Sequence, residues 1–220
     1  EHVSVDLIYG SPGETDADLA ETLDQVSAAD VDHVSAYSLI VEPGTRLAAR
    51  VARGEVPNPS DDVAAHRYEL IDAKLQSLGM TWYEVSNWAK PGGECRHNIA
   101  YWRNQDWLGI GPGAHAHSAG TRSWNLKHPA AWAAKVDDGV SAIADSEILE
   151  AKDVKHEDIM LGLRLRKGLA LTSLGAAGLT QAELAVSEGL LDPQEFANGK
   201  AVLTFQGRLL ADGLVARLWA

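Results

Sequence analysis

The residues best suited to chemistry lie in one stretch, from Cys95 to His117. It contains three histidines, two tryptophans, one tyrosine and the only cysteine of the chain. Imidazole nitrogens bind metals or carry protons, and aromatic rings give flat apolar walls. A packed core does not need this mixture, whereas a pocket for a large, flat and partly polar ligand does. The stretch therefore predicts such a pocket.

Three glycines alternate within this stretch, at Gly109, Gly111 and Gly113. Backbone without side chains on one face lets another group approach closely, so we predict a glycine-rich pocket here. The run does not join a strand to a helix, and Pro112 interrupts it. We therefore reject a dinucleotide-binding fingerprint.

Other candidates are weaker when taken alone. His115 and His117 could share a metal, but no carboxylate or cysteine accompanies them closely, so we predict no metal site made by this chain. Asp6 lies inside an apolar strand, where a carboxylate needs an internal hydrogen bond or a bound ligand, and both readings stay open. Cys95 lacks a paired base and is a poor candidate nucleophile. No catalytic residue is assigned.

The overall composition restricts the class of protein. A net charge of −12, a pI near 5.0 and the absence of any basic run argue against a nucleic-acid partner. No apolar run is long enough to span a bilayer, so we expect membrane contact only through a partner. A single cysteine suits a reducing cytoplasm and cannot by itself hold an iron–sulfur cluster. Because the chain opens with Glu1 directly ahead of a strand, we read it as a fragment.

The elements that must position these residues alternate in the first ~90 positions. Residues 3–9 are β-branched and apolar and read as a buried strand, and a helix begins after Thr15. Residues 31–41 form a second apolar run, which completes a β-α-β unit and implies a parallel sheet. Another helix and a third strand, residues 80–85, follow. Asp6 would then lie near the carboxyl end of its strand, where α/β sheets bind ligands.

The remainder of the chain has a different character. Residues 86–127 show no periodicity and read as a long irregular segment, a kind that is usually functional. We predict a short helix to about residue 136 and a long helix over 146–166. Several short helices and a small hairpin follow, which indicate a winged-helix-like domain after a boundary near residue 140. Its few basic residues favour a docking or lid role over DNA binding.

Two motifs resemble a known family. Residues 6–15, Asp-Leu-Ile-Tyr-Gly-Ser-Pro-Gly-Glu-Thr, are similar to the DLIYGxPxQT segment of radical SAM enzymes related to oxygen-independent coproporphyrinogen III oxidase, with Glu14 where glutamine is usual. Residues 97–102, His-Asn-Ile-Ala-Tyr-Trp, resemble the HNxxYW signature of the HemW branch, regarded as haem chaperones. Residues 41–45, 83–89 and 109–115 also resemble that branch, so the similarity covers essentially the whole chain.

The resemblance implies a fold and a set of cofactors. The fold would be α/β: the later strands of a partial (β/α)6, TIM-like radical SAM barrel over residues 1–140, including the aromatic, histidine- and glycine-rich loop 86–127. Residues 141–220 would be the HemN-type C-terminal domain. The implied cofactors are S-adenosylmethionine, a [4Fe–4S] cluster and haem. The family's CxxxCxxC cluster loop lies upstream of the matched region, so the cluster ligands would lie outside this chain.

By the same resemblance, Asp6 and Ile40 would contact S-adenosylmethionine, and His115 would lie near it. The haem-associated residues would be His97, Asn98, Tyr101 and Trp102. The function implied is a haem chaperone that binds haem or porphyrin and delivers haem to a target protein. The alternatives are a coproporphyrinogen III oxidase of porphyrin biosynthesis and an inactive fragment, and the HNxxYW signature favours the chaperone.

Overall fold

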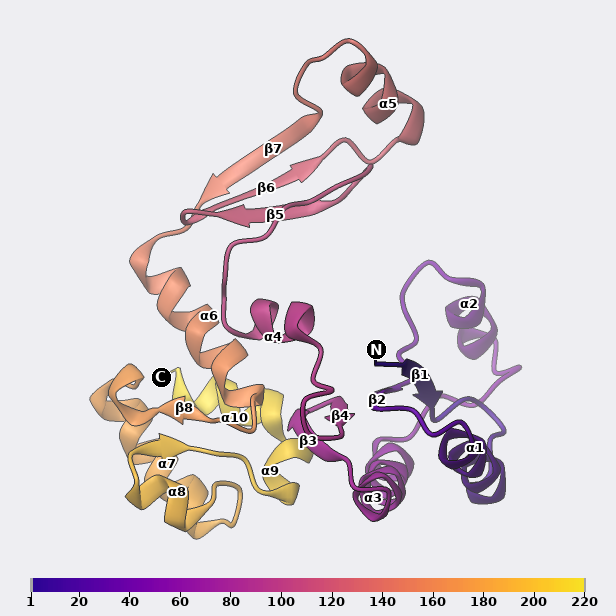
Figure 1. Ribbon diagram of the computed structural model, residues 1–220, viewed down its shortest axis with the longest axis vertical. Coiled ribbons are helices and arrows are strands. Elements are labelled where there is room, and N and C mark those ends of the chain that lie inside the picture. Colours follow the sequence, from indigo (N-terminus) through magenta and orange to yellow (C-terminus); the bar gives the residue numbers. More distant parts are fainter. Residues whose placement is uncertain (1, 220) are drawn as a thin grey trace. The chain divides into compact units, whose positions relative to one another are not determined.

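The computed structural model describes residues 2–219 and divides into two compact units, residues 1–95 and 96–220 (Figure 1). The first unit is a four-stranded sheet with helices. The second contains a three-stranded sheet and a mainly helical C-terminal part.

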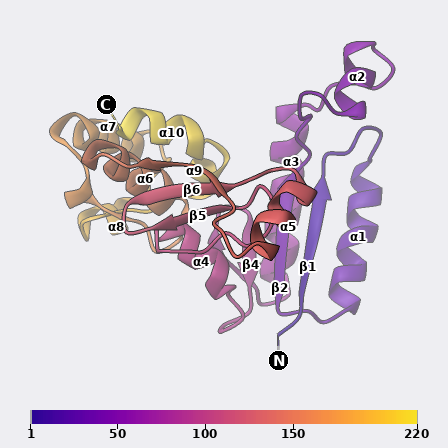
Figure 2. The same ribbon diagram turned by 90° about the horizontal axis from the view of Figure 1, so that it is seen from above.

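The first unit begins with the predicted β-α-β unit. Strand β1 (Ser4–Tyr9) pairs in parallel with β2 (His33–Ser38), from Ser4 opposite His33 to Tyr9 opposite Ser38. Between them α1 (Asp16–Ala28) starts at Thr15, whose side chain accepts the amide of Asp18 in a reciprocal capping box. Figure 2 shows α1 running alongside β1. The prediction of a parallel pair is confirmed here.

The rest of this sheet departs from the prediction. Strand β3 (Thr81–Glu84) forms as expected, but β4 (Asn87–Ala89) lies between β2 and β3 and is antiparallel to both. The predicted parallel sheet is therefore limited to β1 and β2, because β4 makes the rest of the sheet antiparallel. The chain reverses after β3, which carries Trp88 into the core, where it is fully buried. Burying a large aromatic side chain outweighs continuing the strand.

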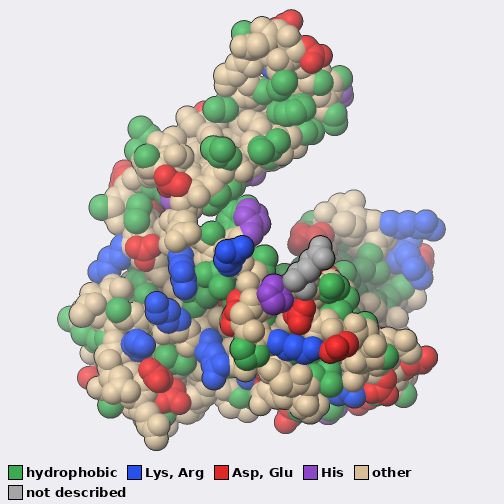
Figure 3. Space-filling view, in the orientation of Figure 1, with side chains coloured by type: hydrophobic (Ala, Val, Ile, Leu, Met, Phe, Trp, Pro, Cys, Tyr) green, Lys and Arg blue, Asp and Glu red, His purple; other side chains and the backbone are tan. Residues whose placement is uncertain are grey.

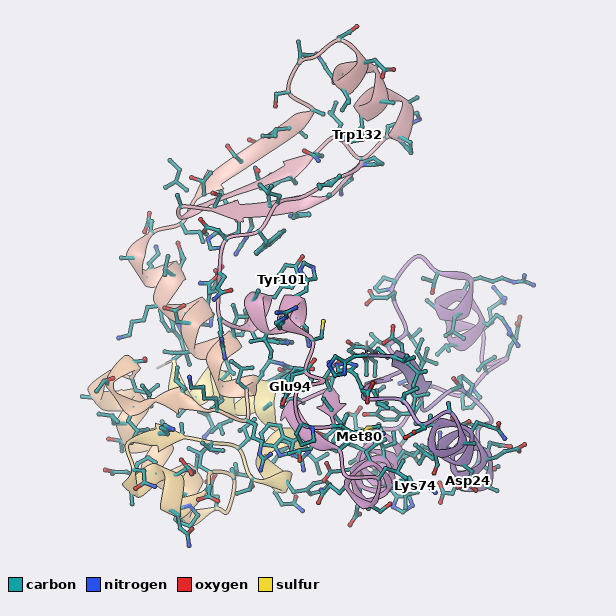
Figure 4. All side chains as sticks on the ribbon, in the orientation of Figure 1. Asp24, Lys74, Met80, Glu94, Tyr101 and Trp132 are labelled. Carbon is teal, nitrogen blue, oxygen red and sulfur yellow. The ribbon has the colours of Figure 1, made fainter. Side chains whose placement is uncertain are left out.

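Helix α3 (Asp61–Ser77) anchors this reversal. Its Tyr68 hydroxyl donates to the carbonyl of Val85 (2.7 Å), and its Asp72 accepts from the Trp88 indole Nε1 (2.7 Å). Lys74 of α3 pairs with Asp24 of α1 (2.7 Å; Figure 4). By contrast, α2 (Arg46–Ala52) buries none of its residues.

The second unit opens with elements that the sequence did not predict. Residues 86–127 contain not only β4 but also α4 (Arg96–Trp102), β5 (His115–Ser118) and β6 (Thr121–Asn125). The two strands form a hairpin whose turn places Ala119 and Gly120 at positive φ. The prediction of an irregular segment over residues 86–127 was wrong. The strands carry polar and aromatic side chains, which hide the alternating pattern of a strand.

The third strand of this sheet replaces part of a predicted helix. Strand β7 (Ile143–Ile148) pairs with β6 after α5 (Pro129–Asp137), and α6 (Ala151–Arg164) starts only beyond it. A helix over 146–166 was therefore wrong at its start, since pairing with β6 overrides the local pattern. Hydrophobic side chains are exposed over this sheet and α5 (Figure 3), including those of Ile143 and Ile148.

The C-terminal part is small and mainly helical, as predicted. After α6 come a two-stranded antiparallel sheet and short helices around a core that includes Leu163, Leu191 and Leu214. These elements are β8 (Leu169–Ala170), a 3-10 turn (Leu171–Ser173), α7 (Ala176–Ser187), α8 (Pro193–Ala197), β9 (Lys200–Ala201), α9 (Phe205–Leu209) and α10 (Ala211–Leu218). Residue 140 falls between α5 and β7, and the boundary there stays a prediction.

Candidate functional site

Asp6 and Ile40 both belong to the first unit. Along β1, Val5, Leu7 and Tyr9 are the more buried side chains, and Asp6 alternates with them and is exposed. Ile40 lies two residues beyond the carboxyl end of β2 and is 70% exposed. The Asp6 carboxylate is thus available to a ligand. Asp6 is the third of the six residues of β1, however, so its predicted place near the carboxyl end of the strand was wrong.

A hydrogen-bonded chain that sequence reasoning missed shares this sheet. His33 of β2 is buried, with Nδ1 2.7 Å from the Ser4 hydroxyl and Nε2 2.8 Å from the Tyr83 hydroxyl. Burial lowers the pKa of His33, although the charges of Asp6 and Glu94 oppose that shift. The polar positions 33 and 35 alternate with apolar 34 and 36, and this period of two could have revealed the polar face.

The turn after β1 is held by Glu14, which stands where glutamine is usual in the DLIYGxPxQT segment. Glu14 accepts the amide of Gly10 (2.7 Å), and the buried Arg67 donates to both its carboxylate and its carbonyl. Tyr9, at the end of β1, is also buried, which raises the pKa of its hydroxyl to about 12. Internal bonds therefore hold the turn that follows β1.

The four signature residues lie on two different faces of α4. His97 and Tyr101, four residues apart, make an edge contact with ring centroids 4.8 Å apart, and Tyr101 meets Trp107 at 5.0 Å. His97 and Tyr101 are exposed (Tyr101 is labelled in Figure 4). Asn98 and Trp102 belong to the neighbouring face, and the Trp102 ring lies under the Arg164 guanidinium at 5.1 Å. The structure thus brings His97 and Tyr101 together and turns Trp102 toward α6.

The three glycines shape the backbone of the second unit. A Cβ on Gly109 would lie 2.0 Å from the carbonyl oxygen of His115, so the group that approaches this glycine is the chain itself. Gly111 and Gly113 have positive φ, and the Asn125 side chain donates to the carbonyls of Gly109 (3.2 Å) and Gly111 (2.9 Å). These contacts account for the glycines without a ligand, and the glycine-rich pocket stays a prediction.

The two histidines of β5 differ in exposure. His115 is exposed, with its ring 5.8 Å from that of Trp124, and it belongs to the second unit while Asp6 and Ile40 belong to the first. His117 is 6% exposed, and its Nε2 is buried and has no hydrogen-bond partner among residues 2–219. Within residues 2–219 no group of three or more metal-binding side chains is arranged to hold a metal ion. Over the same residues no helix is both long and apolar enough to cross a membrane.

The chain is similar to curated proteins from many organisms. It is 52% identical over 217 residues to the heme chaperone HemW of Mycobacterium tuberculosis strain H37Rv, with 99% of this chain and 55% of that protein covered. The chain belongs to the HemW family. It is also 31% identical over 220 residues to the HemW of Bacillus subtilis, covering 96% of this chain and 57% of that protein. It therefore spans a little over half the length of these HemW proteins. No family model matches the sequence.

A solved structure shows the same fold. The coproporphyrinogen III oxidase of Escherichia coli, a radical SAM enzyme, superposes with a TM-score of 0.74 at 22% identity, over 98% of this chain and 54% of that one. At this identity the likeness establishes the fold and not the reaction. The prediction of a partial radical SAM barrel with a helical C-terminal part is confirmed.

Proposed function

We propose that this chain is part of a haem chaperone of the HemW type, which binds haem and passes it to a recipient protein. The observation that carries the proposal is the exposed imidazole of His97 beside the rings of Tyr101 and Trp107. A histidine nitrogen is a common axial ligand of haem, and haem packs against broad apolar walls; this side of α4 offers an imidazole and aromatic rings. The Mycobacterium tuberculosis relative that is 52% identical to this chain is named heme chaperone HemW.

We also propose that the intact protein uses S-adenosylmethionine and a [4Fe–4S] cluster, which together supply radical chemistry when bound. With one cysteine, this chain leaves the cluster ligands to residues outside it. Asp6 would bind S-adenosylmethionine through its exposed carboxylate, and Ile40 would pack against it. The radical SAM fold and the accessibility of Asp6 and Ile40 support this assignment.

The proposed partners follow from the same function. Haem or porphyrin is the ligand, and a haem-accepting protein is the recipient. The acidic composition opposes binding to nucleic acid, and contact with a membrane would occur through the recipient. The proposed location is the cytoplasm, where a single cysteine stays reduced.

Haemin titration of the intact protein tests the proposal. We expect saturable binding with a Soret band that weakens in two variants. His97→Ala would remove the proposed haem ligand, and Trp102→Ala would remove a side chain that holds α4, the helix that carries His97. His128→Ala, which removes another exposed histidine of the second unit, is the matched control. Absence of saturable binding in the wild type would refute the chaperone. Decarboxylation of a porphyrinogen by the reconstituted intact protein would establish the oxidase instead.

A further inference from the structure

The helix that carries His97 has little of its own to hold it. Helix α4 spans only Arg96–Trp102, and none of its residues is buried. A helix this short is marginal without tertiary contacts, so its place depends on the side chains that touch it. Two such contacts lead to α6: Trp102 lies under Arg164, and Asn104, just beyond α4, donates to Asp158 at 3.2 Å.

Arg164 connects three helices. It is the last residue of α6, its side chain is 20% exposed, and its guanidinium carbon lies 5.1 Å from the centre of the Trp102 ring. Its Nη1 donates to Asp212 of α10 at 2.6 Å. The bond to Asp212 of α10 therefore orients the guanidinium, which lies over the face of the Trp102 indole. This arrangement favours a cation–π contact.

The indole of Trp102 relies on this contact. Its Nε1 is buried and finds no hydrogen-bond partner among the described residues. A tryptophan in a fixed place is normally held by packing together with its N–H bond. With the N–H unused, packing and the guanidinium above the ring set the orientation of Trp102.

The orientation of Trp102 determines where His97 points. The two residues lie on adjacent faces of the same helix, so a rotation of α4 about its axis that moves Trp102 also turns His97 and Tyr101. We propose that Arg164 is a positioning residue for the haem site, through which α6 and α10 fix the face that α4 presents. What His97 binds rests on the proposed function, whereas the placement of α4 by Arg164 does not.

The experiment combines hydrogen exchange with haemin titration of the intact protein. In Arg164→Ala we expect faster amide exchange in residues 96–102, with exchange in α7 unchanged. We further expect a haemin Kd raised roughly three- to tenfold, the range that loss of one cation–π contact gives. The spin-state and Soret signatures of ferric haem should shift, because the axial nitrogen is misplaced. Arg166→Ala, an exposed arginine two positions on, is the matched control and should behave as wild type.

A second pair of variants covers the case in which Arg164→Ala does not fold. Arg164→Lys keeps the charge without the planar guanidinium, and Asp212→Ala removes only the carboxylate that orients it. Both should give a smaller rise in α4 exchange, and wild-type exchange in both overturns the proposal. Wild-type haemin affinity and an unchanged spectrum in a folded Arg164→Ala variant also overturn it. A wild type that binds no haemin, with α4 exchange still dependent on Arg164, refutes the proposed function and leaves the positioning role standing.

Discussion

The sheet of the first unit and the signature helix of the second hold their candidate residues in opposite ways. Asp6 stands on a strand whose alternate side chains, those of Val5, Leu7 and Tyr9, are the more buried ones, next to a second strand in full parallel register. His97 stands on a helix that buries no residue and is held by ring contacts and by α6. One region is fixed by its core, and the other by a few side chains, so the second is easier to displace without unfolding.

Two buried histidines repeat this contrast. Both ring nitrogens of His33 in the first unit have hydrogen-bond partners, the hydroxyls of Ser4 and Tyr83. His117 in the second unit is equally buried, yet its Nε2 has no such partner in the part of the chain that the structure describes. An unsatisfied buried polar atom costs about 1–3 kcal/mol. The bonding capacity of the His33 ring is therefore used, whereas that of His117 is partly unused, on a strand that pairs with Trp107.

The largest effect should come from the core of the first unit. Trp88→Ala removes a fully buried indole and leaves the buried Asp72 without its bond to the Nε1. We expect a loss of about 3–5 kcal/mol in the free energy of unfolding, as for other buried aromatic residues. Chemical denaturation followed by circular dichroism measures it.

Trp102→Ala makes the same substitution in the second region and sharpens the contrast. Because Trp102 is only partly buried, we expect well under half of that loss in stability, together with a clear effect on haemin binding. An equal loss of stability in the two variants would show that both regions depend on a core, and the comparison would fail.

A glycine gives the next effect in size. The Cβ of Gly109→Ala would collide with the His115 carbonyl, and backbone cannot yield as a flexible side chain does. We expect a loss of about 1–3 kcal/mol, as for overpacked sites. Gly213→Ala is the control, because Gly213 lies inside α10 with open space around its Cβ position. Gly213→Ala should raise the free energy of unfolding by about 0.5–1 kcal/mol, because alanine favours a helix more than glycine does. A neutral Gly109→Ala in the same denaturation assay would mean that the segment is loose enough to serve as a pocket.

The same contrast explains what the sequence could predict. The β1-α1-β2 unit was predictable because apolar strands and the Thr15 capping box are local signals. The β5-β6 hairpin was not, since its turn uses Ala119 at positive φ, a conformation that a non-glycine residue rarely signals. The HNxxYW motif falls on α4, but it does not indicate which residues of that helix face outward, because Trp102 contacts Arg164 from more than sixty positions away.

The smallest effect is a pH dependence of the first unit. Because burial lowers the pKa of His33 below the value of ~6.5 expected in the unfolded chain, the unfolded state takes up this proton more readily. The free energy of unfolding should therefore fall as the pH drops below ~6.5, and stop falling on this account once the pH is below the lowered pKa. His33→Gln should flatten this part of the curve.

The control distinguishes burial from the mere presence of a histidine. His128→Gln changes an exposed histidine at the start of α5 and should leave the slope near pH 6 as in the wild type. Carboxylates such as Asp18 and Asp30, whose pKa values are lowered by hydrogen bonds, lose their contribution only in more acidic solution, so the two windows separate. If His33→Gln retains the full slope between pH 6.5 and ~5, the hydrogen bonds to Ser4 and Tyr83 do not oppose protonation of His33. The hydrogen bonds of the first unit would then tolerate a charge, and the distinction from His117 would rest on packing alone.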